Sequence, residues 1–443
     1  MSALVLTISG LPEQVRAADE DAASTGSASA PTTMFSRAYL QEVWERETLF
    51  GDWLGMRKNL MDNGIYPKLR MSHYYQESTS GGIRDHGEYL GKMDYRADVD
   101  LNKLAGTWPG LYASVHAESR WGQTIGEYVG PFNLPNANGL WPLPGDYSGT
   151  QVTQLVMGQA LPTPIGRFDV LAGKLSALDL VTTIYPHVAS GQEAFMNVNS
   201  LVTAWPWFRF VNLVMYGAAA WISDDQGRIQ GGLIAFGQDN VSTTWQIDES
   251  FEDGVGLLGF YRYFWEIDGK VGSLAFFAGG ATKQYQALED TDWSPILGGN
   301  VLIPTLGDRD RRPWAIAPYL YQELWSGEQG QKIFIFTGGS YAREDPSFAD
   351  WHYFASIEAF GAIPKRRGDR MGFAYSYNNL GKDLKDALDL IGIDARDHYS
   401  FEWYYNVEIN KWLHVTANFQ LLQNAQKGDN MAVVPGMRAV IDF

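Results

Sequence analysis

Hydrophobic and polar residues alternate along several segments of the chain from residue 65 onward. Successive side chains of a β-strand point to opposite faces, so a period of two predicts strands with one apolar and one polar face. In one segment the apolar set is Gly91, Met93, Tyr95, Ala97, Val99 and Leu101, and the set between them is Lys92, Asp94, Arg96, Asp98, Asp100 and Asn102. The pattern recurs at residues 111–120, 399–410 and 413–421. The chain is therefore predicted to be all-β.

The make-up of the two faces indicates a barrel in a membrane. The apolar faces are rich in aromatic residues, which reach 14% of the chain, and the polar faces carry charges of both signs. No uncharged apolar run reaches the ~18 residues that a membrane-spanning helix needs. Strands with lipid on one side and water on the other satisfy both observations. We predict a transmembrane antiparallel β-barrel with a short helix before it.

The lengths of the connections support a barrel independently. About sixteen alternating segments are present, and their connections alternate between short and mostly long, as outer-membrane barrels require. Short turns are expected at residues 103–110, 162–166, 223–227, 268–272, 326–331, 364–370 and 410–412. Other connections include residues 122–150, 176–209, 288–312 and 381–397, whereas 343–350 and 424–430 are brief. An even number of strands returns both ends of the barrel to the periplasmic side.

The first 47 residues are predicted to lie outside the barrel. Ser2–Leu11 is a short apolar stretch, and Val15-Arg16-Ala17 resembles a small-residue cleavage site. Residues 1–17 are interpreted as a signal peptide, 18–47 as a flexible periplasmic leader, and 48–443 as the barrel domain. Because the usual basic start of a signal is missing, a truncated start and a plain disordered tail both remain open. A helix is predicted over Asp52–Asn63, with Asp52 as its cap.

Charge and motifs narrow the possible chemistry. The net charge of −17 argues against nucleic acid as a partner, and the absence of cysteine excludes disulfides and thiolate chemistry. Residues 254–259 match GxGxxG, but they precede a strand-like segment rather than the helix that a dinucleotide site needs. No other catalytic motif and no Cys/His cluster is present, and no pair of carboxylates stands out as a glycosidase site. We expect no enzyme activity, no cofactor and no metal.

Three sets of residues carry a family resemblance. They are Leu49-Phe50-Gly51-Asp52-Trp53-Leu54-Gly55-Met56-Arg57 with Leu60 and Gly64-Ile65, then Gly173-Lys174-Leu175 with Phe195-Met196-Asn197, and last Asn418-Phe419-Gln420 with residues 435–443. Over residues 48–443 the chain resembles the carbohydrate-selective porins of the OprB type. It departs at Leu54, where the family more often has glycine, and in a muted, proline-poor motif of the penultimate strand. Neither departure lies in the predicted pore.

The resemblance implies a sixteen-stranded barrel in the bacterial outer membrane. It also implies passive diffusion of glucose-like sugars through the barrel. It further implies that Phe443 is the assembly signal read by the barrel-insertion machinery. The partners it suggests are carbohydrate solutes, the outer-membrane bilayer and that machinery.

Charged residues of three consecutive strands fall on the inferred lumen face: Arg70, Asp94, Arg96, Asp98, Glu118 and Arg120. They are interpreted either as a water-filled wall kept soluble by mutual salt bridges or as a constriction ring. Sugar hydroxyls accept hydrogen bonds from arginine and donate to carboxylates, and sugar rings pack on aromatic faces. The remaining candidates for the pore lining are Tyr112, Asn197, Arg262, Glu402, Tyr404 and Arg438, with Phe260 and Phe264 as further aromatic platforms. Residues 176–209 are expected to fold inward and narrow the lumen, with an ordinary surface loop as the alternative.

The sequence thus predicts an outer-membrane porin for passive, sugar-preferring diffusion through a charged, aromatic-lined constriction. A general, unselective porin with the same fold is the first alternative. A barrel enzyme that acts on lipid or glycan is the second. A monomer and a homotrimer both remain open.

Overall fold

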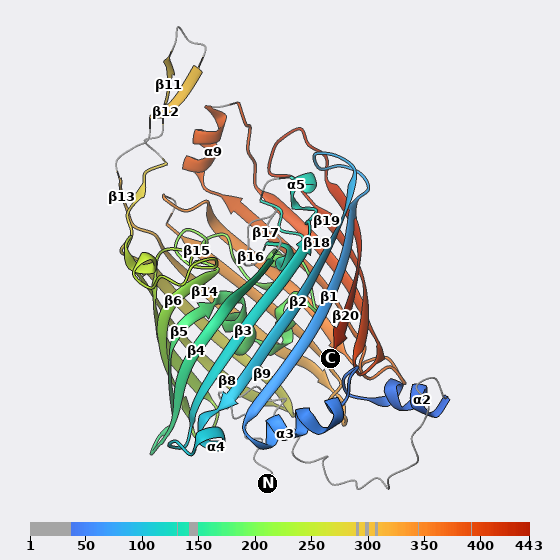
Figure 1. Cartoon of the computed structure of the whole chain (residues 1–443). Coiled ribbons are helices and arrows are strands. Elements are labelled where there is room, and N and C mark those ends of the chain that lie inside the picture. The colour runs from blue at the N-terminus through green and yellow to red at the C-terminus, as the bar shows by residue number, and fades with distance from the viewer. Residues whose placement is uncertain are drawn as a thin grey trace.

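Sixteen strands form one closed antiparallel barrel in which each strand pairs with its neighbours in chain order (Figure 1). The computed structural model describes residues 37–130, 132–140, 149–288, 292–296, 301–305, 309–343, 345–390 and 392–443. The barrel strands are β1 Ile65–Ser78, β2 His86–Asp100, β3 Leu111–Gly122, β4 Gly149–Thr163, β5 Gly166–Ser176, β6 Val214–Asp224, β7 Ile229–Gly237, β8 Val255–Ile267, β9 Lys270–Ala281, β14 Trp314–Ser326, β15 Lys332–Ala342, β16 Ala349–Phe360, β17 Arg370–Leu380, β18 His398–Asn410, β19 Leu413–Leu422 and β20 Ala432–Asp442. The predicted fold class and strand number are confirmed.

The period-two pattern sets the two faces of the wall as predicted. In β2, Lys92, Asp94 and Asp98 are buried on the inner side, whereas Tyr95 on the opposite face is exposed. Antiparallel pairing aligns the inner charges of neighbouring strands, since Arg70 of β1 lies opposite Asp94 of β2. The barrel closes between β1 and β20, where Arg70 lies opposite Asp442. A closed barrel leaves no unpaired strand edge in lipid, which is why strands can cross a membrane in this form.

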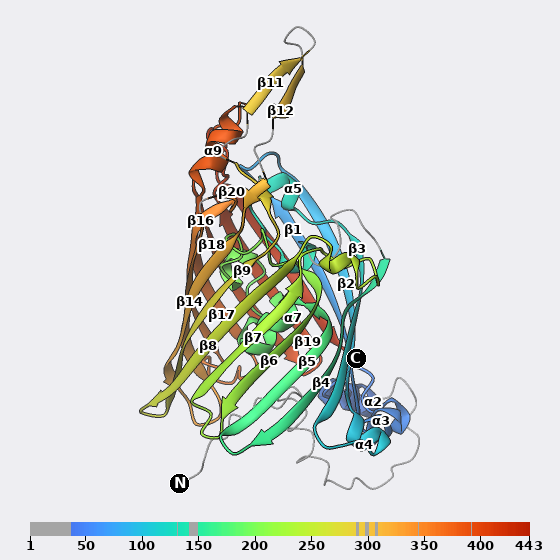
Figure 2. The ribbon, with the colours of Figure 1, turned by 90° about the vertical axis from the view of Figure 1, so that its left-hand side faces the viewer.

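Short and long connections lie at opposite ends of the barrel. The expected short turns all lie at one end, which in outer-membrane barrels faces the periplasm. The other end carries longer connections with α5 (Gly126–Val129), α6 (Ala137–Leu140), η3 (Glu249–Phe251) and α9 (Lys382–Asp389). It also carries two small two-stranded sheets, β10 (Tyr285–Gln286) with β13 (Arg309–Arg311) and β11 (Asp292–Ile296) with β12 (Val301–Thr305). The β11–β12 hairpin projects well beyond the rim (Figure 2).

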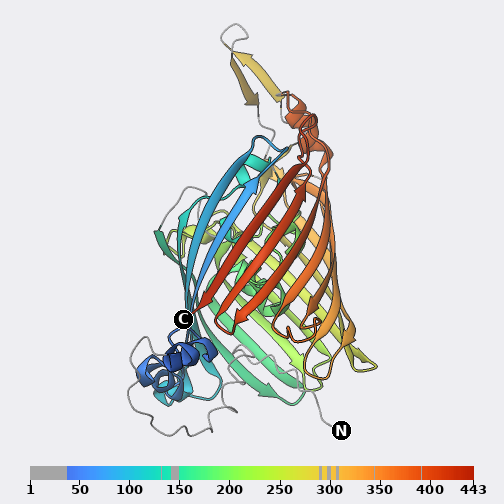
Figure 3. The same ribbon diagram turned by 90° about the vertical axis from the view of Figure 1, so that its right-hand side faces the viewer.

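The N-terminal helices lie at the short-turn end beside the end of β20 (Figure 3). Within the predicted leader, Arg37–Glu45 form α2, and residues 1–36 lie outside the described residues. The expected helix over Asp52–Asn63 is shorter than predicted: a 3-10 turn, η1 (Trp53–Gly55), precedes α3 (Met56–Asp62), and α4 (Leu101–Ala105) follows β2. Asp52 is not the residue that begins α3, although its carboxylate accepts a hydrogen bond from Lys58 N at 2.7 Å. None of the described helices is long and apolar enough to cross a membrane.

The departure from the family pattern at Leu54 has a conformational meaning. Leu54 has φ 60° and ψ 35°, in the left-handed region where glycine is at ease and other residues lose about 1–2 kcal/mol. Its side chain is exposed, so no packing interaction compensates for this conformation. The glycine that the family resemblance implies at this position would adopt this backbone conformation without strain.

Candidate functional site in the barrel lumen

Residues 177–211, named here the inward loop, leave the end of β5 and fold into the barrel. They include α7 (Ala177–Ile184), η2 (Pro186–Gly191) and α8 (Val198–Leu201). The turn into the barrel is fixed locally, because the Ser176 side chain accepts a hydrogen bond from Asp179 N at 3.2 Å and caps α7. Phe195, Met196 and Asn197 are fully buried within the lumen. The prediction that this connection folds inward is therefore confirmed.

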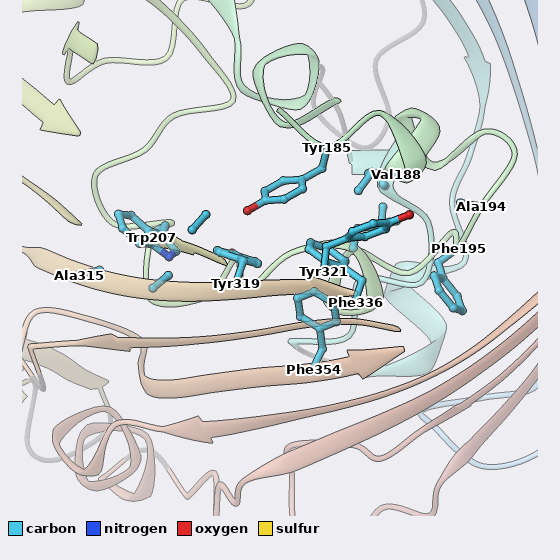
Figure 4. Close-up of a cluster of buried hydrophobic side chains, with 14 of the residues drawn as sticks. Tyr185, Val188, Ala194, Phe195, Trp207, Ala315, Tyr319, Tyr321, Phe336 and Phe354 are labelled. Atoms are coloured by element: carbon cyan, nitrogen blue, oxygen red, sulfur yellow. The ribbon is translucent and has the colours of Figure 1, made fainter. Parts of the chain in front are cut away.

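An aromatic cluster holds the inward loop against the inner face of β14–β16 (Figure 4). Tyr185 of the loop lies 4.9 Å from the ring of Phe336 in β15, and the ring of His187 lies 4.5 Å from the same phenylalanine. Phe336 is also 5.2 Å from Phe354 in β16. The hydroxyl groups of Thr203 and Tyr319 are 2.6 Å apart. The inner wall is thus apolar on this side of the barrel, and the loop forms a packed core with it.

A charged network holds the start of the inward loop against β2 and β3. His116 Nδ1 lies 2.8 Å from Asp179 in α7, and its Nε2 lies 2.9 Å from Asp94. Lys92 Nζ lies 2.9 Å from Asp94 and 3.2 Å from Glu118. Burial works to raise the pKa of Asp179, but the charge and hydrogen bond of His116 outweigh it and hold that pKa below its usual range. Asp94 and Glu118 face inward as predicted, and they serve to anchor the loop.

This network does not resemble an open metal site. Ligand atoms of Asp94, His116 and Glu118 lie within 4.8 Å of one another, and all three side chains are buried. The ammonium group of Lys92, however, lies against both carboxylates, in the position that a cation would take. Its positive charge compensates the two acids without a metal.

A second polar network binds the middle of the inward loop. The Glu402 carboxylate in β18 accepts hydrogen bonds from Met196 N at 2.6 Å and Asn197 N at 3.1 Å. Arg438 in β20 donates to the carbonyl groups of Gly191 and Ala194 at 2.7 and 2.9 Å. The predicted residues Asn197, Glu402 and Arg438 therefore lie together inside the barrel, but the loop covers them.

Tyr404 completes this second network. Its hydroxyl donates to Glu358 at 2.6 Å, and its ring packs edge-on against Phe195 at 4.8 Å. Gly372 on the neighbouring strand leaves the space for this contact, because a Cβ there would lie 2.6 Å from Tyr404 and 2.8 Å from Phe195. The Phe-Met-Asn motif is thus the part of the loop that this second network binds.

A third group of charges keeps partial exposure to the lumen. Arg70 pairs with Asp442 through two contacts of 2.7 Å, and its Nη1 lies 2.6 Å from Glu193 of the loop. Glu193 also lies 3.8 Å from Arg370 of β17. Burial works to raise the pKa of Glu193, but the charges of Arg70 and Arg370 outweigh it and hold that pKa below its usual range. The side chains of Arg70 and Glu193 are 11% and 21% exposed, so this belt of both signs borders open space.

Arg96 is held only by long contacts. Its side chain is 25% exposed, its Nη1 lies 3.4 Å from Asp179, and its Nε lies 3.6 Å from Asp98. These contacts are longer than a good charge-assisted hydrogen bond. Arg96 can therefore donate to a solute without first breaking a strong pair.

The other predicted residues are spread around the wall. Tyr112 and Arg120 of β3 are buried on its inner face. Arg262 of β8 donates to the Ile184 carbonyl at 2.6 Å and stacks over Tyr185 and Phe264 at 4.6 and 4.3 Å. Phe260 stacks on Phe277 of β9 at 5.9 Å. Through its hydrogen bond to Ile184, Arg262 fixes the end of α7 against the wall.

Comparison with protein families decides the identity of the chain. Residues 84–443 match the model of the "Carbohydrate-selective porin, OprB family". The chain belongs to the OprB family.

Solved structures agree with this assignment at the level of the fold. A high-pH structure of Pseudomonas putida OprB is similar with a TM-score of 0.74 and 16% sequence identity, over 90% of this chain and 99% of that one. A low-pH structure of the same protein gives a TM-score of 0.55 and 15% identity over the same shares. A comparison with curated protein sequences gave no match. This OprB-family porin is thus a channel-forming barrel of the bacterial outer membrane.

Two sequence motifs have structural roles in the porin wall. The GxGxxG stretch lies at the start of β8, as its strand-like context indicated, so it has no helix to bind a dinucleotide. The Gly-Lys motif of β5 is not part of the pore, because Lys174 Nζ donates to the Thr244 carbonyl at 3.0 Å and lies 4.7 Å from the Trp245 ring. Residues 239–254 fold back over this part of the wall.

Sequence reasoning did not single out six residues that complete the site: Lys92, His116, Asp179, Glu193, Glu358 and Arg370. Asp179 and Glu193 lie in the inward loop, and Arg370 lies at the start of β17. The loop has no periodic pattern that could assign a direction to its side chains. Arg370 is the first residue of β17. The alternating pattern extends from it in one direction only, so its facing could not be assigned from the sequence. Asp179 and Glu193 could have been found from the sequence as the acidic residues of a loop that was expected to fold into the lumen.

Proposed function

We propose that this porin passes glucose-sized sugars through a constriction formed by the inward loop and the charged wall of β1–β3. The belt of Arg70, Glu193 and Arg370 is the observation that supports this most strongly, since it sets charges of both signs at the border of the open lumen. A polyhydroxylated solute can use donors and acceptors together, whereas a small ion gains little from mixed signs. Its contacts must stay weak, because a pore has to release what it binds.

The arrangement of the loop supports selectivity over general leakage. Separate contacts hold the loop on several sides, among them the aromatic cluster, the Asp94–His116–Asp179 network and the Glu402–Arg438 network. A loop held on several sides keeps a constriction of fixed width. Fixed polar groups at a narrow point are what distinguish similar solutes.

Arg96 provides the sharpest test of the proposed function. Arg96→Ala should weaken sugar block of the ion current about tenfold, the effect of roughly 1–2 kcal/mol from one charge-assisted hydrogen bond. Unit conductance should hold or rise, because the change widens the lumen. Met93→Ala is the matched control, since Met93 lies on the opposite face of the same strand. Equal sugar block in the two variants, measured in planar bilayers, would contradict the proposal, and absence of block in the unaltered protein would favour an unselective porin.

We also propose that Phe443 is the assembly signal of the barrel. Its backbone N–H donates to Leu69 O at 3.0 Å, and its ring lies 5.1 Å from Phe50. Arg57 donates to the Phe443 carbonyl at 3.1 Å. Phe443 thus lies where β20 meets β1, at the seam that closes the barrel.

A further inference from the structure

A groove of about 730 Å³ lies between two turns at the periplasmic end of the barrel. One wall is the β14–β15 turn and the other is the β16–β17 turn. Its lining includes Trp325, Glu328, Gln329, Gln331, Lys365 and Arg367. The volume falls within the roughly 300–1,000 Å³ of ordinary ligand sites. None of its lining residues belongs to the proposed constriction of the inward loop and β1–β3.

The β16–β17 turn is a built structure. Arg366 N donates to Ile363 O at 3.0 Å, and Gly361 N donates to Asp369 O at 2.8 Å. The Arg366 guanidinium binds Asp369 through contacts of 2.9 and 2.8 Å and also reaches the Glu408 carbonyl. These bonds fix the direction in which the neighbouring side chains project.

Lys365 has a backbone conformation that favours glycine. Its φ is +68°, it follows Pro364, and it is the third residue of the turn closed by the Ile363–Arg366 bond. This position of such a turn ordinarily takes glycine or asparagine. A lysine in this conformation has a strained backbone, and strained residues are found most often at functional sites.

The cations of the turn differ in whether they have a partner. Arg366 is neutralised by Asp369, whereas Lys365 and Arg367 have no carboxylate within 4 Å among the residues that the structure describes. Both are exposed, on a chain whose net charge is −17. Glu328 is the one acid among the lining residues. The groove therefore offers unpaired positive charge to an incoming anion.

An aromatic platform and amide groups accompany this charge. Trp325 is 43% exposed and lies beside the β14–β15 turn, where its ring would be 3.1 Å from a Cβ at Gly327. Gln329 N donates to Gln331 Oε1 at 3.1 Å, which orders the amides of that turn. The apolar face of a partly exposed tryptophan can pack against a sugar ring, and amide groups can form hydrogen bonds with the hydroxyl groups of the sugar.

We propose that this groove binds the glycan of the cell wall, a polymer of sugar rings that carry carboxylate-bearing peptide stems. Trp325 would pack on a sugar ring while Lys365 and Arg367 pair with stem carboxylates through charge-assisted hydrogen bonds. The groove opens at the end of the barrel that faces this polymer. A neutral sugar leaving the pore would need no cations there.

The test is co-sedimentation of the detergent-solubilised porin with purified peptidoglycan sacculi. The Lys365→Gly/Arg367→Gln double variant should raise the dissociation constant by about 100-fold, roughly tenfold for each lost contact. Because Lys365→Gly relieves the strained backbone, the variant should melt at or above the temperature of the unaltered protein. Arg228→Gln removes an exposed cation from the β6–β7 turn at the same end and should bind like the unaltered porin.

The outcomes separate the proposal from its alternatives. Failure of the unaltered porin to sediment, or equal sedimentation of the double variant, would overturn it. Equal loss with Arg228→Gln would reduce the effect to nonspecific attraction and would overturn it too. Soluble disaccharide-peptide should compete with sacculi, whereas uncharged chitin oligosaccharides should compete poorly; strong competition by chitin would show a neutral sugar site instead.

Discussion

The carboxylate of Asp179 and Nδ1 of His116 lie 2.8 Å apart, joining the inward loop to strand β3. The other nitrogen of the same ring lies 2.9 Å from Asp94. A histidine between two carboxylates donates from both nitrogens, so the ring is an imidazolium with an acid on each side. The first turn of the loop is therefore fixed to the wall by charge.

Asp179→Asn should loosen the start of the inward loop. The substitution leaves His116 and Arg96 with one acid fewer, and breaking a buried pair in this way costs about 3–5 kcal/mol. We expect larger fluctuations of the open-channel current in planar bilayers and faster proteolysis within residues 177–211. Asp386→Asn on the exposed face of α9 is the control. Current noise that is unchanged by Asp179→Asn would show that the other contacts of the loop hold it without the Asp179–His116 pair.

Phe336→Ala should release the opposite side of the loop. Phe336 is buried against Tyr185, His187 and Phe354, and truncation of a buried phenylalanine costs about 3–5 kcal/mol. Unit conductance should rise, and sugar block should weaken because the constriction is no longer held at one width. Phe373→Ala, on the exposed outer face of β17, should leave both quantities unchanged. Identical conductance in the two variants would count against a packed core inside the lumen.

The charge of Glu193 should persist in mildly acidic solution. Its pKa is held below the usual value of about 4.3 by Arg70 and Arg370, which outweigh the opposing effect of burial. A depressed pKa contributes stability that is present above that usual value and is lost as pH falls through the lowered one. Because Glu193 stays ionised between pH 8 and pH 5, its contribution to ion selectivity, measured from reversal potentials, should be constant over this range. Glu193→Gln should shift selectivity toward anions at pH 7; a pH-dependent step near pH 6 that this variant abolishes would contradict the assignment.

Phe443→Ala should lower the yield of assembled barrel. The ring contact with Phe50 is lost, and the proposed assembly signal is removed with it. The yield is measured as the fraction of heat-modifiable protein on gels of outer-membrane fractions. Phe50→Ala removes the same contact but leaves Phe443, so it separates the two effects. Equal yields from all three proteins would refute the signal.

The wall was predictable because its pattern is local. Lys92, Asp94 and Asp98 alternate with apolar residues, and that alternation alone decides which side of β2 they occupy. The inner face of β14–β16 was not predictable in the same way. Tyr319, Phe336 and Phe354 are apolar and yet face inward, so both faces of their strands have the same polarity.

The roles of the inner charges were less predictable than their positions. Glu402 and Arg438 face the lumen as their alternation predicts, but each binds the backbone of a loop that is distant in the sequence. Which charge is covered and which stays open depends on where that loop comes to rest. Glu193 shows the same limit, since its partners Arg70 and Arg370 lie on strands far apart in the chain.

The packing of the inward loop also sets the order in which the molecule can be built. The loop follows β5, but Tyr185 and His187 pack on β15, and Glu193 and Asn197 meet residues of β17 and β18. These strands come more than a hundred residues later in the chain, and contacts of such sequence separation form slowly. If the N-terminal half of the chain inserts first, the inward loop has no wall to pack against until the strands of the last third of the chain have inserted. A barrel caught at that stage would leak solutes of any kind, so tight coupling of insertion to closure protects the cell's permeability barrier.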